Sequence, residues 1–216
     1  MRLRRLRNED GFTLAELLVA CALIGVVMAG LFSILQSGQQ SYLTGSNQVE
    51  AQQALRLTIL RVTNELRDAG YCPTCSAGAP PFTALAAVSA TGFTIQNDWN
   101  GSGGIATGTV TQVVTAADGS TTNVTRGEQV VYAFAGGTLT RREMGVDGAG
   151  VPVITNLASL TLTYLDADGN VTANAANVRA VVVSAVGQPE VQPASFVGGR
   201  VQVAMTDSVR LRNRAQ

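Results

Sequence analysis

The chain has 216 residues, with 15 basic and 15 acidic side chains and therefore no formal net charge at pH 7. It lacks the basic surface that nucleic-acid binding requires, so we expect no nucleic-acid partner. Histidine, the commonest general base and metal ligand, is absent. With no recognisable nucleophile–base pair or metal cluster, we expect a protein that is not an enzyme and uses no cofactor.

A long apolar stretch follows a basic N-terminus. Between Leu17 and Leu35 the chain carries no charged residue, and four arginines precede this stretch: Arg2, Arg4, Arg5 and Arg7. As a helix the stretch would be about 28 Å long, which matches the ~30 Å hydrocarbon core of a bilayer. The sequence therefore predicts a single membrane-spanning helix, with the arginines in the cytoplasm and the rest of the chain exported.

One carboxylate, Glu16, stands at the start of this apolar stretch. Thr13 and Glu16 have the spacing of a capping box, in which each side chain accepts a backbone N–H of the other residue. A negative charge also suits the N-terminus of a helix. The box accounts for Glu16 but leaves the Gly11-Phe12 pair directly before it unexplained.

The N-terminal segment MRLRRLRNEDG/FTLAELLVA resembles the class III signal of type IV prepilins. The resemblance implies that a membrane-embedded prepilin peptidase cuts between Gly11 and Phe12 and then N-methylates Phe12. It also implies that Glu16 pairs with the N-terminal amine of a neighbouring subunit. Residues 1–11 would then be a leader peptide, and residues 12–36 the transmembrane or filament-core helix.

Three other export signals compete with this interpretation. An ordinary signal anchor with a capped helix leaves the glycine and phenylalanine unexplained. A secretory signal peptide has a shorter apolar region and a small-residue cleavage site. A lipobox at residues 18–21 would make Cys21 a lipidated N-terminus, but here the long apolar run follows Cys21 instead of preceding it.

Residues 37–70 are expected to form an amphipathic helix continuous with the membrane helix, with loosening at Gly38 or Gly45 because glycine weakens a helix interior. Leu55, Ile59, Val62 and Leu66 recur at helical spacing and form one apolar stripe. Such a stripe normally packs on a core. Gly70 and the residues after it end the helix.

Residues 71–216 are expected to form a β-rich periplasmic or extracellular domain. After Phe82 the chain has short β-branched runs separated by glycine and asparagine turns. The expected strands are 92–96, 109–115, 129–134, 160–165, 178–186 and 201–211. The predicted fold class is α+β, with a long N-terminal helix packed on an antiparallel sheet, as in pilins.

Three further segments resemble PilW-type minor pilins. The region 56–71 ends in Ala-Gly-Tyr, residues 164–170 read YLDADGN, and residues 209–213 read VRLRN, an ending shared with GspJ-type pseudopilins. The region between about 76 and 155 matches no pattern of the family. The resemblance implies assembly rather than catalysis.

The Cys72-Pro73-Thr74-Cys75 segment allows three interpretations. A zinc site needs about four ligands, and neither histidine nor a third nearby cysteine supplies them. A thioredoxin-like motif should open a helix, whereas this segment follows one. A structural disulfide between Cys72 and Cys75 suits an exported domain and is the prediction we adopt.

Asp166, Asp168 and Asn170 offer three oxygen ligands and could bind calcium. The EF-hand pattern needs a later glutamate that is missing here. The Asp-Gly pair indicates a hairpin turn first, and we adopt no metal site.

The sequence therefore predicts a minor, PilW-like type IV pilin at the pilus tip or in the priming complex. Its expected partners are prepilin peptidase, major and minor pilins, an inner-membrane assembly platform and, before assembly, membrane lipid. Its expected location is the inner membrane, with a cytoplasmic leader and a periplasmic domain, and then the pilus. The alternatives are a GspJ-like minor pseudopilin of a type II secretion system and a pilus-tip adhesin.

Overall fold

The computed structural model describes residues 11–75, 81–189 and 201–214. Its contacts divide the chain into two compact units, Met1–Ser46 and Asn47–Gln216. The helix α1 (Leu14–Asp68) contributes to both units. The leader residues 1–10 lie outside the described residues.

The described strands all lie in the second unit. They are β1 (Leu85–Ser89), β2 (Gly92–Gln96), β3 (Thr109–Thr115), β4 (Thr121–Gly127), β5 (Gln129–Ala135), β6 (Thr138–Glu143), β7 (Val151–Ile154), β8 (Leu157–Leu165), β9 (Ala180–Gly187) and β10 (Val203–Arg210). Two short 3-10 helices, η1 (Ala175–Asn177) and η2 (Arg212–Arg214), flank the last two strands.

The helix α1 is 55 residues long and contains no proline. It remains helical through Gly38 and Gly45, so the predicted continuity is confirmed and neither glycine interrupts it. Glu16 in the first turn and Arg67 in the last turn have the charges that the helix dipole favours. The helix ends before Gly70, whose φ of 81° is a conformation that glycine adopts without strain.

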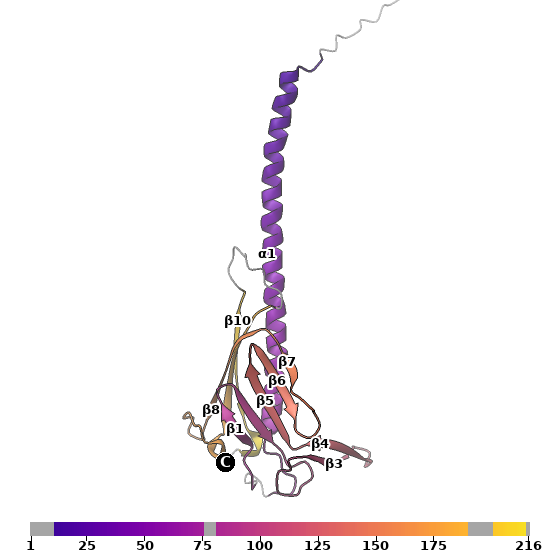
Figure 1. The fold of residues 1–216 in the computed structure, drawn as a ribbon, viewed down its shortest axis with the longest axis vertical. Coiled ribbons are helices and arrows are strands. Elements are labelled where there is room, and N and C mark those ends of the chain that lie inside the picture. Colours follow the sequence, from indigo (N-terminus) through magenta and orange to yellow (C-terminus); the bar gives the residue numbers. More distant parts are fainter. Residues whose placement is uncertain (1–10, 76–80, 190–200, 215–216) are drawn as a thin grey trace, which may run out of the picture. The chain divides into compact units, whose positions relative to one another are not determined.

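Three antiparallel sheets follow α1 (Figure 1). Strands β1-β2-β5-β6-β7 form a five-stranded sheet, β10-β9-β8 a three-stranded sheet, and β3-β4 a separate hairpin. Their pairings are antiparallel throughout. The predicted α+β class, a long helix on antiparallel sheet, is therefore confirmed.

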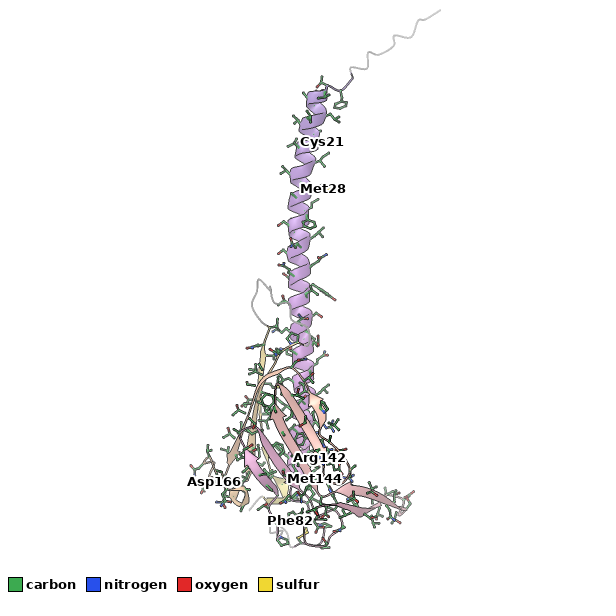
Figure 2. All side chains as sticks on the ribbon, viewed as in Figure 1. Cys21, Met28, Phe82, Arg142, Met144 and Asp166 are labelled. Carbon is green, nitrogen blue, oxygen red and sulfur yellow. A yellow bond between two sulfur atoms is a disulfide. The ribbon has the colours of Figure 1, made fainter. Side chains whose placement is uncertain are left out.

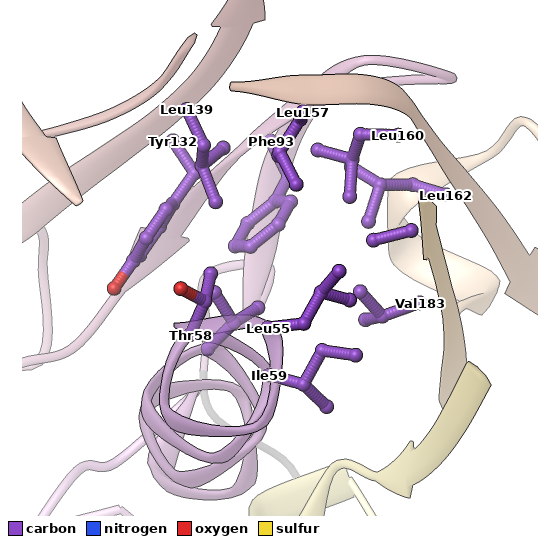
Figure 3. Close-up of a pocket in the computed structure, with 12 residues that line it drawn as sticks. Leu55, Thr58, Ile59, Phe93, Tyr132, Leu139, Leu157, Leu160, Leu162 and Val183 are labelled. Carbon is purple, nitrogen blue, oxygen red and sulfur yellow. The ribbon is translucent and has the colours of Figure 1, made fainter. Parts of the chain in front are cut away.

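The core of the second unit lies between α1 and the five- and three-stranded sheets. The predicted stripe of Leu55, Ile59, Val62 and Leu66 is buried, with at most 3% of each residue exposed. Figure 3 shows Leu55 and Ile59 directed toward side chains of the sheets. The cavity at this contact measures only about 10 Å³, so the side chains fill the interior, as expected of a close-packed core.

Most predicted strands are close to the observed ones. The ranges 92–96 and 109–115 agree with β2 and β3, and the other four differ from β5, β8, β9 and β10 by up to three residues at either end. Strands β1, β4, β6 and β7 were not predicted. In β8 the alternation is confirmed, because Leu160, Leu162 and Tyr164 are buried while Thr161 is exposed.

Candidate functional site

The first turn of α1 contains the predicted capping box. The Thr13 backbone N–H and hydroxyl both donate to Glu16 Oε2, at 2.9 and 2.8 Å. The Glu16 N–H in turn donates to Thr13 Oγ1 at 3.3 Å. The glutamate therefore holds the helix start in place while its carboxylate is occupied by a neighbour in its own chain.

The Gly11–Phe12 bond lies outside regular structure, just before this box. Phe12 is 89% exposed, and no atom approaches within 4 Å of the place where a Cβ on Gly11 would stand. Because no helical hydrogen bond holds this peptide, an enzyme could bind it without first unwinding α1.

The apolar part of α1 in the first unit has no protein covering it. None of the residues from Gly11 to Ser46 is buried, and the large apolar side chains between Leu17 and Leu35 are 51–72% exposed. Cys21 and Met28 lie on this stretch (Figure 2), and Cys21 is a free, exposed thiol. By length and composition this part of the helix could cross a membrane.

A second group of candidate residues lies where α1 meets the sheet. The structure joins Cys72 and Cys75 by a disulfide with 5.4 Å between their Cα atoms. The Thr74 hydroxyl between them donates to the Gly101 carbonyl at 2.9 Å. The Gly70 N–H donates to the Gln96 carbonyl at 2.9 Å. The chain leaving the helix is thus fastened to the strand and loop beside it.

Two buried carboxylates organise the same loop, and the sequence analysis did not find them. Asp98 is fully buried, and its Oδ1 accepts the Ser102 N–H at 3.0 Å while its Oδ2 accepts the Gly103 N–H at 2.7 Å. Glu128 is 1% exposed, and its two carboxylate oxygens accept the Trp99 and Ala106 N–H groups. The pattern of Asp98 followed by serine and glycine was the only available signal, since such residues favour side-chain-to-backbone turns.

Trp99 is a half-buried anchor of this loop. Its ring centroid lies 5.2 Å from that of Tyr71. The Arg126 guanidinium carbon lies 4.7 Å from the Trp99 ring centroid, which is within cation–π range. Other side chains of the same domain cover part of the Trp99 ring. The ring therefore exposes less surface than an aromatic ring that stacks against a bound sugar.

The Asp166–Asn170 segment is a turn. Asp166 Oδ1 accepts the Asp168 and Asn170 N–H groups at 3.0 and 2.9 Å, and Gly169 has a φ of 83°. The carboxylate is thereby used to hold the backbone. The structure supports the turn and leaves calcium binding by Asp166, Asp168 and Asn170 untested.

The comparisons with known proteins concern mainly the N-terminal segment. Residues 6–32 match the family model for the prokaryotic N-terminal methylation motif. Over 65 residues the chain is 33% identical to prepilin peptidase-dependent protein B of Escherichia coli K12, a match that covers 30% of this chain and 35% of that protein. The chain therefore spans about a third of the length of this curated relative.

A solved type IV-like pilin from Thermus thermophilus aligns with 76% of this chain and 97% of its own, at 15% identity and a TM-score of 0.45. At that score the likeness carries no argument about function. The methylation motif instead coincides with the observed capping box and the uncovered apolar helix. On this evidence the chain resembles type IV pilin-like proteins in its N-terminal methylation motif and in the apolar helix that follows it.

Proposed function

We propose that the protein is a minor, PilW-like type IV pilin, a structural and non-enzymatic subunit of the pilus tip or priming complex. The observation that carries the proposal is the uncovered apolar helix between Leu17 and Leu35, directly behind the methylation motif. Apolar side chains exposed over such a length are unstable in water. They need lipid before assembly and neighbouring helices afterwards.

Processing would convert the membrane form into the form that assembles. Prepilin peptidase cuts between Gly11 and Phe12 and methylates the new amine of Phe12. The exposure of Phe12 and the lack of helical structure at this bond support the assignment. The printed name of the Escherichia coli relative, a prepilin peptidase-dependent protein, supports it as well.

The same elements determine location and partners. The arginine-rich leader stays in the cytoplasm, residues 12–36 lie in the inner membrane, and residues 71–216 lie in the periplasm until export. An inner-membrane assembly platform then transfers the subunit into a filament of other pilins. The bulk of the domain supports a place at the tip, since the ten strands in the described part of the chain leave little room in a thin shaft.

Processing is tested with Gly11→Val in the full-length protein. The variant should remain an uncut precursor because the added side chain blocks a site that is open in the wild type. Mass spectrometry of the wild type should find N-methylated Phe12 at the N-terminus. Gly25→Val is the matched control, because Gly25 also has no atom within 4 Å of its would-be Cβ, and it should be cut normally.

The minor role is tested by quantifying the protein in sheared filaments and locating its domain with labelled antibodies. A minor tip subunit should be present in far fewer copies than the major pilin and should be labelled at filament ends. A wild-type protein that begins at lipidated Cys21 would overturn the processing step. Labelling along the whole shaft would overturn the minor role.

A further inference from the structure

Three potential metal ligands meet at the corner where α1 passes into the sheet. The Cys72 and Cys75 sulfurs and a carboxylate oxygen of Asp98 all lie within 4.8 Å of one another. Asp98 belongs to the loop after β2 and is brought here by the fold. The sequence analysis rejected zinc for lack of ligands near the cysteines, and the structure supplies one.

The surroundings of Asp98 favour a cation. This carboxylate is fully buried, and it belongs to none of the ion pairs among the described residues. Its two accepted N–H groups, from Ser102 and Gly103, leave acceptor positions free on both oxygens. A buried carboxylate without a positive partner is costly, and a bound metal ion would remove that cost.

The contact between Cys72 and Asp98 contributes little stabilisation while the disulfide is closed. Cys72 Sγ lies 3.4 Å from Asp98 Oδ2. A disulfide sulfur carries no proton and cannot donate to the carboxylate. With the thiol restored, the same two atoms could share either a proton or a metal ion.

We propose that the reduced protein binds one zinc ion, or a similar divalent cation, through Cys72, Cys75 and Asp98, in competition with the disulfide. Zinc–sulfur bonds of about 2.3 Å and zinc–oxygen bonds of about 2.0 Å at tetrahedral angles place sulfur and oxygen about 3.5 Å apart. The observed 3.4 Å between Cys72 Sγ and Asp98 Oδ2 already fits this requirement.

The two sulfurs must separate to about 3.8 Å to bind the same tetrahedral ion. Pro73 and Thr74 between them are exposed, so the loop has room for this change. The Asp98 carboxylate needs no movement, because the Ser102 and Gly103 N–H groups hold it in place. Water would be the fourth ligand, which would leave the site open on the solvent side.

The exchange between the two forms balances as follows. A dithiol reductant transfers two electrons and two protons to the Cys72–Cys75 bond and becomes a disulfide itself. The two thiols release their protons when the metal binds, since the thiolate is the ligand. A disulfide oxidant reverses the exchange: it takes two electrons from the two thiolates and two protons from water and becomes a dithiol. The Cys72–Cys75 bond forms again, and the ion leaves because the disulfide sulfurs no longer offer thiolate ligands.

The experiment uses the full-length protein in detergent with Cys21→Ala, which removes the one other cysteine. The reduced protein, freed of reductant, is titrated with Co²⁺ and then with Zn²⁺. We expect one Co²⁺ per chain with thiolate-to-cobalt charge-transfer absorption, displacement by Zn²⁺, and protection of both thiols from alkylation. The oxidised protein should show no such absorption.

Asp98→Asn should weaken Zn²⁺ binding about tenfold or more, because it replaces an anionic ligand with a neutral amide. Asp118→Asn is the control, as Asp118 lies in the exposed β3–β4 turn, and should change nothing. X-ray absorption of the wild-type zinc complex should show two sulfur and two oxygen neighbours around the zinc ion. This measurement does not depend on the folding of a variant. Absence of binding by the reduced protein, unchanged affinity in Asp98→Asn, or a shell without a protein oxygen would each overturn the proposal.

Discussion

Two tyrosines in the core of the second unit differ in what their hydroxyl groups contact. Tyr164 is 5% exposed, and its hydroxyl lies 2.9 Å from both the Ser89 and Gly92 carbonyl oxygens, to either of which it can donate. Tyr132 is 1% exposed, and its hydroxyl has no hydrogen-bond partner within the described part of the chain. Its ring stacks on Phe93 with centroids 5.1 Å apart.

Replacing each tyrosine by phenylalanine should therefore have different effects. Tyr164→Phe removes a satisfied donor and leaves carbonyls without it, so it should lower the free energy of unfolding by about 1 kcal/mol. Tyr132→Phe removes an unsatisfied buried hydroxyl and should leave stability unchanged or raise it. Urea unfolding of both variants measures the difference, and equal losses would contradict the contact pattern.

Burial also raises the pKa of both phenols, and the charge of Glu65 adds to the rise at Tyr132. The folded protein therefore holds these protons more tightly than the unfolded chain, whose tyrosines ionise near pH 10. The resulting stability is fully present below about pH 10 and is lost as the pH rises toward the folded-state pKa values. The urea midpoint should fall between pH 9 and pH 11, and should fall less in the Tyr132→Phe, Tyr164→Phe double variant.

At the scale of elements, one ion-pair network fastens α1 to the five-stranded sheet. Arg141 in β6 donates through Nε to Glu65 at 3.0 and 3.1 Å and through a terminal nitrogen to Glu143 at 3.2 Å. The Arg141 side chain is only 19% exposed. Arg61 contacts the same Glu65 at 3.7 Å, but its side chain is 54% exposed.

Arg141→Ala should lower the free energy of unfolding by about 1.5–3 kcal/mol, the usual value for charged hydrogen bonds out of full contact with water. Arg61→Ala, which removes the other cation of the same glutamate, should cost at most about 0.5 kcal/mol. Chemical denaturation of both variants tests the pair. Equal costs would mean that helix and sheet do not depend on the Arg141 contacts.

Most elements that sequence reasoning found have one buried face, whereas β3, in the exposed hairpin, was found from its run of β-branched residues. The stripe of α1 and the alternation in β8 follow the core directly. The four missed strands lack that signal for separate reasons. Strand β4 has hydroxyls and a half-buried valine because its hairpin is exposed, β6 carries the charges of the ion-pair network, β7 contains Pro152, and β1 is interrupted by Ala87 with a φ of 47°.

At the candidate site, too, contacts between neighbours in the chain can be predicted from the sequence, whereas contacts that depend on the folded loop cannot. The Thr13–Glu16 box and the turn at Asp166 depend on neighbours in the chain, so spacing predicts them. The burial of Asp98 and Glu128 depends on backbone N–H groups that a folded loop turns toward them. The serine and glycine after Asp98 indicate at most a turn, so the burial of these two residues emerges only from the structure.

At the scale of the whole molecule, the two units differ in how far they bury their own apolar surface. The second unit has a core formed by α1 and its sheets, with Leu55, Leu66 and Val181 fully enclosed. The first unit encloses none of its described side chains. Its apolar surface must be covered by something else, and in the proposed function this is lipid before assembly and other subunits afterwards.

In the proposed function, Glu16 decides whether the first unit can pass from lipid into a filament. In lipid, a charge at the helix centre costs about 2.5–3.5 kcal/mol on insertion scales and less near the interface. In the uncut chain Thr13 satisfies the carboxylate. In a filament the carboxylate would lie among apolar helices, where leaving a buried charge unpaired costs about 3–5 kcal/mol. The proposed cleavage after Gly11 would supply a cationic amine on Phe12 that can meet it.

Glu16→Val should therefore insert and be cut normally, yet enter sheared filaments or the priming complex poorly. Glu16→Asp, which shortens the reach by one methylene, should be intermediate. Thr13→Val separates the two roles of the glutamate, since it removes only the capping hydroxyl, worth about 1 kcal/mol at a helix start. If pairing with an amine matters, Thr13→Val should assemble far better than Glu16→Val. Wild-type levels of Glu16→Val in filaments would show that Glu16 acts only as a helix cap.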